Sequence, residues 1–150
     1  MSQSTTQQST QQPIAILSAS RTPMGGMLGS LSTASATELG ATAIRDSLSK
    51  SALDNKQIDE VLMGCVLTAG VGQAPARQAA LSAGLDRSTA CTTINKVCGS
   101  AMKAVMMASN ALRAGQSKVV VAGGMESMSR APYLIPQGRQ GYRFGHAQML

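Results

Sequence analysis

The sequence predicts an α/β fold with a mostly parallel sheet and helices on both of its faces. Short apolar runs, which suit buried parallel strands, alternate along the chain with longer segments in which apolar residues recur at helical spacing. Such alternation is typical of a parallel sheet covered by its connecting helices. Of the 150 residues, 43% are apolar and only 13% are charged, which indicates tightly packed layers with much buried surface.

The first half of the chain contains two expected strands and one expected helix. The apolar run Ile14–Leu17 predicts the first strand, and the apolar run Val61–Leu67 predicts the second. Between them, Ser35 and Glu38 have the spacing of a capping box, which marks the start of a helix. Apolar residues at helical intervals extend this helix from about Ala36 to Ser51.

The second half continues the alternation. A Gly-rich loop precedes Pro75, which is well placed to open a helix, and Gly84 is well placed to close it. The remaining elements are expected as a helix over Ala76–Ala83, a strand over Thr89–Val97, a helix between Cys98 and Gly115, and a strand over Lys118–Ala122.

Cys98 is the candidate catalytic residue, because it lies at the turn between a strand and the most apolar helix. Only Lys103 and Arg113 are charged between Cys98 and Gly115, so this helix is expected to be buried between layers. The start of a helix offers unpaired N–H groups and a positive dipole, which can make a thiol a nucleophile. The alternative is a buried structural cysteine. The carboxyl end of a parallel strand, where ligands bind in open sheets, favours the functional interpretation.

The other cysteines and the charge pattern exclude several classes of protein. The chain has three cysteines, an odd number without a CxxC pair: Cys65, Cys91 and Cys98. We therefore expect neither a disulfide framework nor a metal site. The expected compartment is the reducing cytoplasm. Cys65 is expected in the core, and Cys91 on the strand face of Thr93 and Asn95 without a catalytic role. The net charge of +6 is spread singly, unlike the dense basic face of a nucleic-acid-binding protein.

Composition divides the chain into three segments. Residues 1–12 are rich in Ser, Thr and Gln without charge or an apolar core, so we expect a disordered leader instead of a signal peptide or a membrane span. Residues 13–130 form the layered domain. Pro and Gly break up any period in residues 131–150, and the chain ends without a cap or polar tail, as a truncated polypeptide would.

Four ordered stretches resemble the N-terminal part of the thiolases, and the similarity runs from Pro13 to the end of the chain. The stretch around Cys98 is similar to the acyl-enzyme motif of that family, and the tail from Tyr133 to Gly145 is more similar to acetoacetyl-CoA thiolases than to long-chain degradative ones. The four stretches are Ser20–Pro23, Gly72–Ala80, Ile94–Ala101 and Gly123–Ser129.

The resemblance implies a thiolase-like layered fold of which this chain is the N-terminal half. Residues 13–130 would be the thiolase N-terminal α/β domain, and residues 131–150 the start of the CoA-binding loop region. A complete thiolase continues with a second, similar half that carries a Gly-His-Pro motif and a second cysteine. His146 stands in Phe144–Ala147 and does not match that motif, so it is interpreted as a loop histidine.

The resemblance also implies a reaction. An acetyl-CoA C-acetyltransferase joins two acetyl-CoA molecules into acetoacetyl-CoA and CoA, or reverses this by thiolysis, through an acyl thioester on Cys98. The backbone N–H of Cys98 is expected to stabilise the oxyanion. CoA thioesters are the substrates, and no metal or redox cofactor is implied. A homo-oligomer, dimeric or tetrameric, a role in fatty acid metabolism and a cytoplasmic location are expected, and the 150-residue chain alone is expected to be inactive.

Three alternatives remain open at the level of sequence. The first is a 3-ketoacyl-CoA thiolase of broader chain length, and the second is a non-catalytic thiolase-like half-domain that binds CoA-like ligands. The third is a related condensing enzyme that uses carrier-protein thioesters. A native gene that ends at Leu150 would favour the half-domain, because the catalytic set would then be incomplete.

Overall fold

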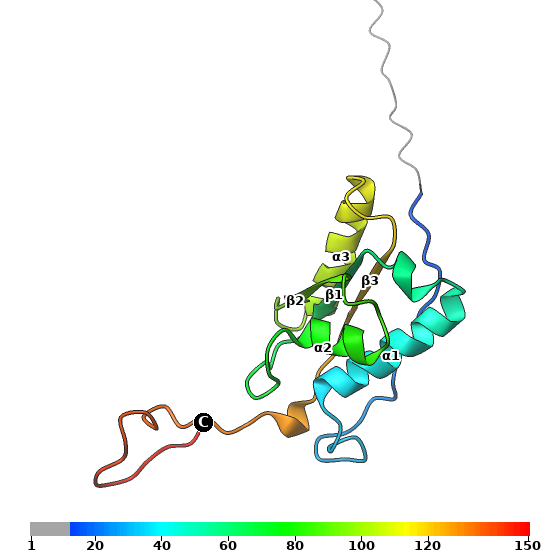
Figure 1. The fold of residues 1–150 in the computed structure, drawn as a ribbon. Coiled ribbons are helices and arrows are strands. Elements are labelled where there is room, and N and C mark those ends of the chain that lie inside the picture. Colours follow the sequence, from blue (N-terminus) through cyan, green and yellow to red (C-terminus); the bar gives the residue numbers. More distant parts are fainter. Residues whose placement is uncertain (1–12) are drawn as a thin grey trace, which may run out of the picture.

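The structure, a computed structural model, describes residues 13–150, and the expected leader over residues 1–12 lies outside them. A parallel three-stranded sheet with the order β2-β1-β3 carries helices on both faces, which confirms the predicted fold class (Figure 1). The elements are α1 (Ala36–Ser51), the 3-10 turn η1 (Asn55–Gln57), β1 (Glu60–Gly64), α2 (Pro75–Ser82), β2 (Ala90–Ile94), α3 (Ser100–Arg113), β3 (Val120–Gly124) and the 3-10 turn η2 (Met128–Arg130).

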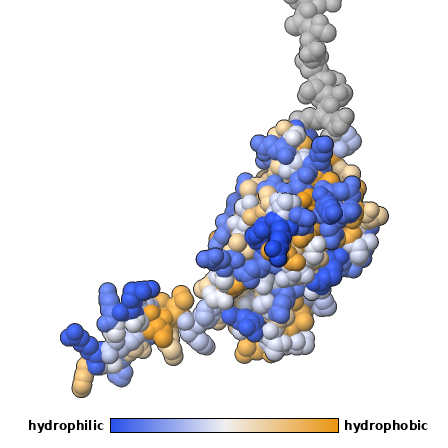
Figure 2. Space-filling model, in the orientation of Figure 1, coloured by the Kyte–Doolittle hydropathy of each residue, from blue (hydrophilic) through white to orange (hydrophobic). Residues whose placement is uncertain are grey.

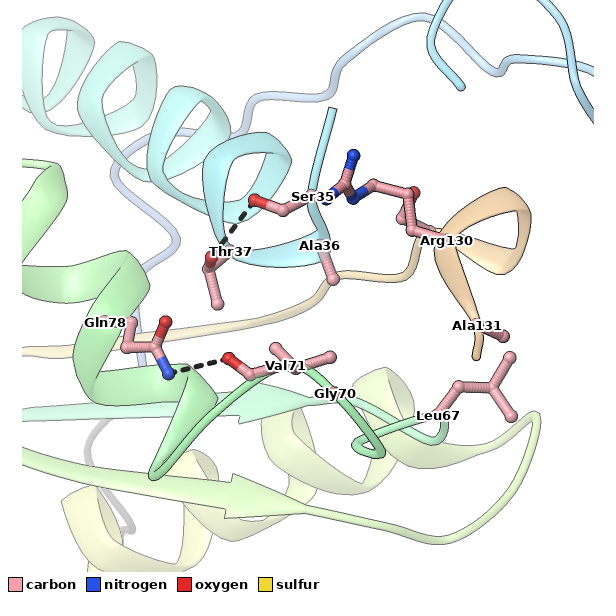
Figure 3. Close-up of a pocket in the computed structure, with 10 residues that line it drawn as sticks. Ser35, Ala36, Thr37, Leu67, Gly70, Val71, Gln78, Arg130 and Ala131 are labelled. Atoms are coloured by element: carbon pink, nitrogen blue, oxygen red, sulfur yellow. Dashed lines mark hydrogen bonds between the residues drawn. The ribbon is translucent and has the colours of Figure 1, made fainter. Parts of the chain in front are cut away.

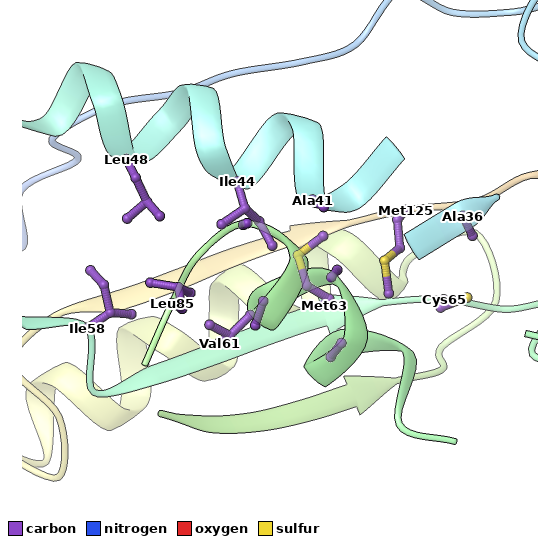
Figure 4. Close-up of a cluster of buried hydrophobic side chains, with 14 residues drawn as sticks. Ala36, Ala41, Ile44, Leu48, Ile58, Val61, Met63, Cys65, Leu85 and Met125 are labelled. Atoms are coloured by element: carbon purple, nitrogen blue, oxygen red, sulfur yellow. The ribbon is translucent and has the colours of Figure 1, made fainter. Parts of the chain in front are cut away.

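The central strand β1 divides the core into two layers. Val61 and Met63 point to one face, where they pack in a cluster with residues of α1 and α2 (Figure 4). Leu62, between them, points to the other face and packs against Ala104 and Ala108 of α3. Because successive strand residues alternate between faces, the apolar run Val61–Met63 of β1 requires a helical layer on each side.

The predicted capping box of α1 is present, and the predicted bounds of this helix are confirmed. The Ser35 hydroxyl accepts a hydrogen bond from the backbone N–H of Glu38, and the Glu38 carboxylate accepts one of 2.8 Å from the N–H of Ser35. These two bonds satisfy donors that a helix start otherwise leaves unpaired.

Helix α3 ends as predicted but is buried on one side only. Gly115, with φ of +70°, follows the helix, and its N–H donates to the carbonyl of Leu112. The predicted burial on nearly all sides is not seen in residues 13–150, where only Ser100, Ala104 and Ala108 of α3 are buried and Met107 is partly buried against the same cluster. The opposite face is apolar and exposed, with Met102 at 72%, Val105 at 51% and Met106 at 55% of their full exposure.

The prediction of a strand at Ile14–Leu17 is wrong. This run has no strand partner among residues 13–150, and Ile16 is 86% exposed. The segment instead lies beside α1, and next to it the Ser18 hydroxyl donates a 2.8 Å hydrogen bond to the carbonyl of Ser47. An apolar run becomes a strand only where a neighbouring strand pairs with its backbone groups.

The ends of the other strands also differ from the predictions. β1 ends at Gly64 instead of Leu67, because the N–H groups of Val66 and Leu67 donate to a carboxylate and not to a strand. β3 begins at Val120 instead of Lys118, because the Asp59 carboxylate takes the N–H groups of the two preceding residues. β2 is shorter than expected at both ends.

The segment 131–150 extends away from the layered body (Figure 1). Its two ends are joined by backbone hydrogen bonds in both directions between Leu134 and Leu150. Figure 2 shows it as a separate lobe with apolar side chains on its surface. Phe144, in this segment, is fully exposed. The assignment of this segment to a CoA-binding region stays a prediction. Within residues 13–150, no helix has the length and apolarity needed to cross a membrane.

Candidate active site

The carboxyl ends of the three strands meet at one edge of the sheet, and their loops are tied together. The N–H of Met125, after β3, donates a 2.9 Å hydrogen bond to the carbonyl of Gly64. The N–H of Cys65, after β1, donates a 3.0 Å bond to the carbonyl of Ile94. This edge is where ligands bind in open parallel sheets, and the turn that carries Cys98 lies on it.

Two glycines bring the start of α3 directly onto the strand ends. A Cβ atom on Gly64 would lie 2.7 Å from the Cβ of Ser100, and one on Gly124 would lie 2.8 Å from the Cβ of Ala101. Contacts this short leave no room for a side chain at either glycine. The distance between the first turn of α3 and the ends of β1 and β3 is therefore fixed by direct contact.

The turn before α3 holds a strained residue. Val97 has a φ of +49°, a left-handed conformation that is unfavourable for a β-branched residue. The Asn95 side-chain oxygen accepts a 3.0 Å hydrogen bond from the N–H of Val97. The buried Ser100 hydroxyl accepts from the N–H of Lys96 at 2.8 Å and donates to the carbonyl of Val97 at 2.6 Å. Strained residues held by their surroundings in this way cluster at active sites.

Cys98 is exposed between this strained residue and Gly99, the N-cap of α3. The structure thus confirms its predicted place at a strand-to-helix turn. Cys98 therefore lies beside the N-terminus of α3, the positive end of the helix dipole, and is accessible to a substrate. The chemical role of Cys98 stays a prediction.

The other two thiols, Cys65 and Cys91, are buried in the core or half-buried against it. Cys65 is 1% exposed, and burial together with the negative charge of Glu126 raises its pKa to about 11. Cys91 is half-buried against the α1–α2 layer, and burial raises its pKa although Arg77 opposes the shift. Since the thiolate is the reactive form, both positions disfavour a nucleophile.

Glu126 is a site residue that reasoning from the sequence missed. Its carboxylate accepts hydrogen bonds from the N–H groups of Val66 at 2.9 Å and Leu67 at 3.3 Å. It therefore joins the loop after β3 to the loop after β1. One signal was available: Glu126 is the last acidic residue of the chain, and it lies in the loop four residues after the end of the strand predicted over Lys118–Ala122.

A cavity of about 230 Å³ lies beside this edge, between the start of α1, the loop after β1 and η2 (Figure 3). The Gln78 side chain at its wall donates a 3.0 Å hydrogen bond to the carbonyl of Val71. Cys98 is not among the lining residues, so this cavity is not the pocket of the candidate nucleophile. Among residues 13–150, no group of three or more His, Cys, Asp and Glu side chains is placed to hold a metal ion. His146 lies in the exposed segment 131–150, as a loop histidine.

Comparisons with known proteins place the chain in a family. Residues 14–150 match the model of the thiolase N-terminal domain. Acetyl-CoA acetyltransferase 2 of Arabidopsis thaliana is 53% identical over 137 residues, which are 91% of this chain and 34% of that protein. The mitochondrial acetyl-CoA acetyltransferase of Homo sapiens is 54% identical over 129 residues, 86% of this chain and 30% of that protein.

A solved structure agrees with the sequence relatives. Acat5 thiolase from Ascaris suum, in complex with coenzyme A, superposes with a TM-score of 0.85 at 41% sequence identity, covering 89% of this chain and 35% of that one. The chain thus spans about a third of the length of the relatives it matches. The match to the family model over residues 14–150 and the shared fold lead to one conclusion: the chain belongs to the thiolase family.

Proposed function

We propose that this chain is the N-terminal portion of an acetyl-CoA C-acetyltransferase in which Cys98 carries the acyl group. One observation supports the assignment above the others: Cys98 is the exposed thiol at the start of α3, whereas Cys65 is buried in the core and Cys91 is half-buried against it, both with raised pKa values. The names of relatives at 50–54% identity support acetyl-CoA as the substrate.

In the first step, the Cys98 thiolate attacks the carbonyl carbon of acetyl-CoA. The carbon–sulfur bond to CoA breaks, CoA leaves as a thiolate, and an acetyl thioester remains on Cys98. A thioester on cysteine is close in free energy to one on CoA, so this exchange runs in both directions. Negative charge develops on the carbonyl oxygen, and N–H donors at the start of α3 are well placed to stabilise it.

In the second step, a base removes a proton from the methyl group of another acetyl-CoA. The resulting carbanion attacks the acetyl thioester, a carbon–carbon bond forms, and the Cys98 thiolate leaves. The products are acetoacetyl-CoA and the free enzyme. Both bases are assigned, by the resemblance to thiolases, to the Gly-His-Pro histidine and the second cysteine of the family.

The partners proposed for the protein are CoA and its acetyl and acetoacetyl thioesters, together with further copies of the same protein. The solved complex of the Ascaris thiolase with coenzyme A supports the first of these. The exposed apolar face of α3 is consistent with a homo-oligomer. Three free cysteines fit a reducing compartment, and we propose the cytoplasm.

Turnover of the full-length gene product tests the proposed function. Thiolysis of acetoacetyl-CoA by free CoA is followed spectrophotometrically beside thiolysis of longer 3-ketoacyl-CoA substrates. We expect preference for acetoacetyl-CoA and loss of activity in Cys98→Ala. Equal rates on the longer substrates would instead favour a 3-ketoacyl-CoA thiolase, and no turnover of any substrate would favour a non-catalytic half-domain.

A further inference from the structure

We propose that Glu126 is a positioning residue for Cys98 and acts through the loop after β1 and the side chain of Asn95. The inference rests on the proposed role of Cys98 as the acyl-carrying nucleophile. Glu126 touches neither Cys98 nor, in this proposal, the substrate. Its carboxylate instead fixes the backbone against which the Cys98 turn is held.

The first link is the clamp between the loops after β3 and β1. The Glu126 carboxylate accepts from the N–H of Val66 at 2.9 Å and from the N–H of Leu67 at 3.3 Å. Hydrogen bonds to an ionised carboxylate are shorter and stronger than those between neutral groups. These two N–H groups have left the sheet, so the carboxylate replaces the partner that a neighbouring strand would supply.

The second link passes through one peptide group to the Cys98 turn. The carbonyl of Val66 accepts a 3.4 Å hydrogen bond from the side-chain amide of Asn95. The oxygen of that amide accepts a 3.0 Å bond from the N–H of Val97, directly before Cys98. Asn95 can serve both ends because an amide donates through its nitrogen and accepts through its oxygen.

The hydrogen bonds that lead from Glu126 through Val66 and Asn95 to Val97, here called the relay, hold a strained residue in place. A β-branched residue at φ of +49° keeps that conformation only while the surrounding contacts hold it. Loss of the clamp frees Val66, weakens the hold of Asn95 and lets the turn relax. A displacement of about 1 Å at a reacting group costs on the order of 100-fold in rate.

Asp59 provides a matched control at the opposite edge of the sheet. Its carboxylate also accepts two backbone N–H groups, from Lys118 at 2.7 Å and from Val119 at 3.0 Å. It stands before β1, at the amino ends of the strands, and far from the Cys98 turn along the sheet. Glu126 and Asp59 therefore each accept two backbone N–H groups with a carboxylate. They differ in position, because Glu126 lies at the carboxyl ends of the strands and Asp59 at the amino ends.

The test compares Glu126→Ala, Glu126→Gln and Asp59→Ala in the full-length gene product. In Glu126→Ala we expect the rate of Cys98 acetylation and kcat to fall about 100-fold, while the KM for acetyl-CoA changes less than about twofold. Glu126→Gln keeps one acceptor oxygen and should recover part of the rate. Hydrogen exchange of the amides in residues 95–99 should quicken in Glu126→Ala and stay unchanged in Asp59→Ala.

The outcomes separate this inference from the proposed function. If wild-type protein is not acetylated on Cys98, the proposed function fails, and the exchange data alone decide whether the relay exists. If wild type is acetylated and Glu126→Ala retains its rate, the positioning role is overturned. It is also overturned if Glu126→Ala and Asp59→Ala lose activity equally and in proportion to their melting temperatures, because a purely structural role predicts that result.

Discussion

Gly64 and Ser100 are in direct contact, so that a Cβ atom on Gly64 would lie 2.7 Å from the Cβ of Ser100. The backbone of the same turn is equally close, with the N atom of Ala101 at 2.8 Å from that position. The end of β1 therefore sets the position of the first turn of α3. Since Cys98 stands two residues before Ser100, the same contact sets the position of the candidate nucleophile.

Gly64→Ala is expected to displace α3 and to impair Cys98. Overpacking of a methyl group into a filled core costs about 1–3 kcal/mol, and urea unfolding should show a loss of this size. The rate of Cys98 acetylation should fall with it. Gly26→Ala is the control, because a Cβ there meets nothing within 4 Å and should leave both measurements unchanged. A tolerated Gly64→Ala with full activity would contradict the close packing.

Ser100→Ala is expected to loosen the strained turn. The hydroxyl is buried and makes two hydrogen bonds, to the N–H of Lys96 and the carbonyl of Val97. Leaving these groups without a partner costs about 1–3 kcal/mol. Thermal or urea unfolding measures the loss, and Ser109→Ala, on the same helix and half-buried, should stay within about 0.5 kcal/mol of wild type. Equal losses in both variants would argue against a special role of the turn.

The element that could be predicted best is the one whose signals are local. The sequence predicts both ends of α1, because Ser35 and Glu38, three residues apart, specify its start and a helical period specifies its length. The end of β1 could not be placed, because it depends on the Glu126 carboxylate, 60 residues away from Val66. An apolar run carries no mark of where its backbone leaves the sheet.

The three thiols should react in a fixed order with iodoacetamide. The pKa of Cys65 is raised from 9.0 to about 11, so at pH 8 it carries about 100-fold less thiolate than an ordinary thiol, and burial slows it further. We expect Cys98 to be alkylated first and Cys65 last, and Cys65 to gain reactivity only as the pH rises toward 11. Peptide mapping of partly labelled protein measures the order. Early labelling of Cys65 at pH 8 would contradict the structure.

Residues 1–150 on their own are expected to associate and to lack turnover. Members of a catalytic set act as a unit, and loss of some of them costs several orders of magnitude in rate. The exposed apolar face of α3 should drive association, which Met102→Lys with Met106→Lys should reduce in sedimentation experiments. Met149→Lys, at a residue of similar exposure in the segment 131–150, is the control. A monomeric chain with acetoacetyl-CoA thiolysis that Cys98→Ala abolishes would contradict this prediction.

The site could be predicted in part. The place of Cys98 at a strand-to-helix turn followed from local residue types, because a β-branched run stops and an apolar helix begins there. The roles of Gly64, Asn95 and Glu126 depend on contacts between loops after different strands, and no local pattern specifies those contacts. Parallel topology brings these loops together, so they become visible only once the strand order is known.

Acetylation of Cys98 is the most direct test of the account. The full-length gene product is incubated with acetyl-CoA without a second substrate, quenched in acid and digested, and its cysteine peptides are examined by mass spectrometry. We expect the acetyl group on the peptide that contains Cys98, and no acetylated cysteine in Cys98→Ala. An acetyl group on Cys65 or Cys91, with Cys98 unmodified, would contradict the assignment of the nucleophile.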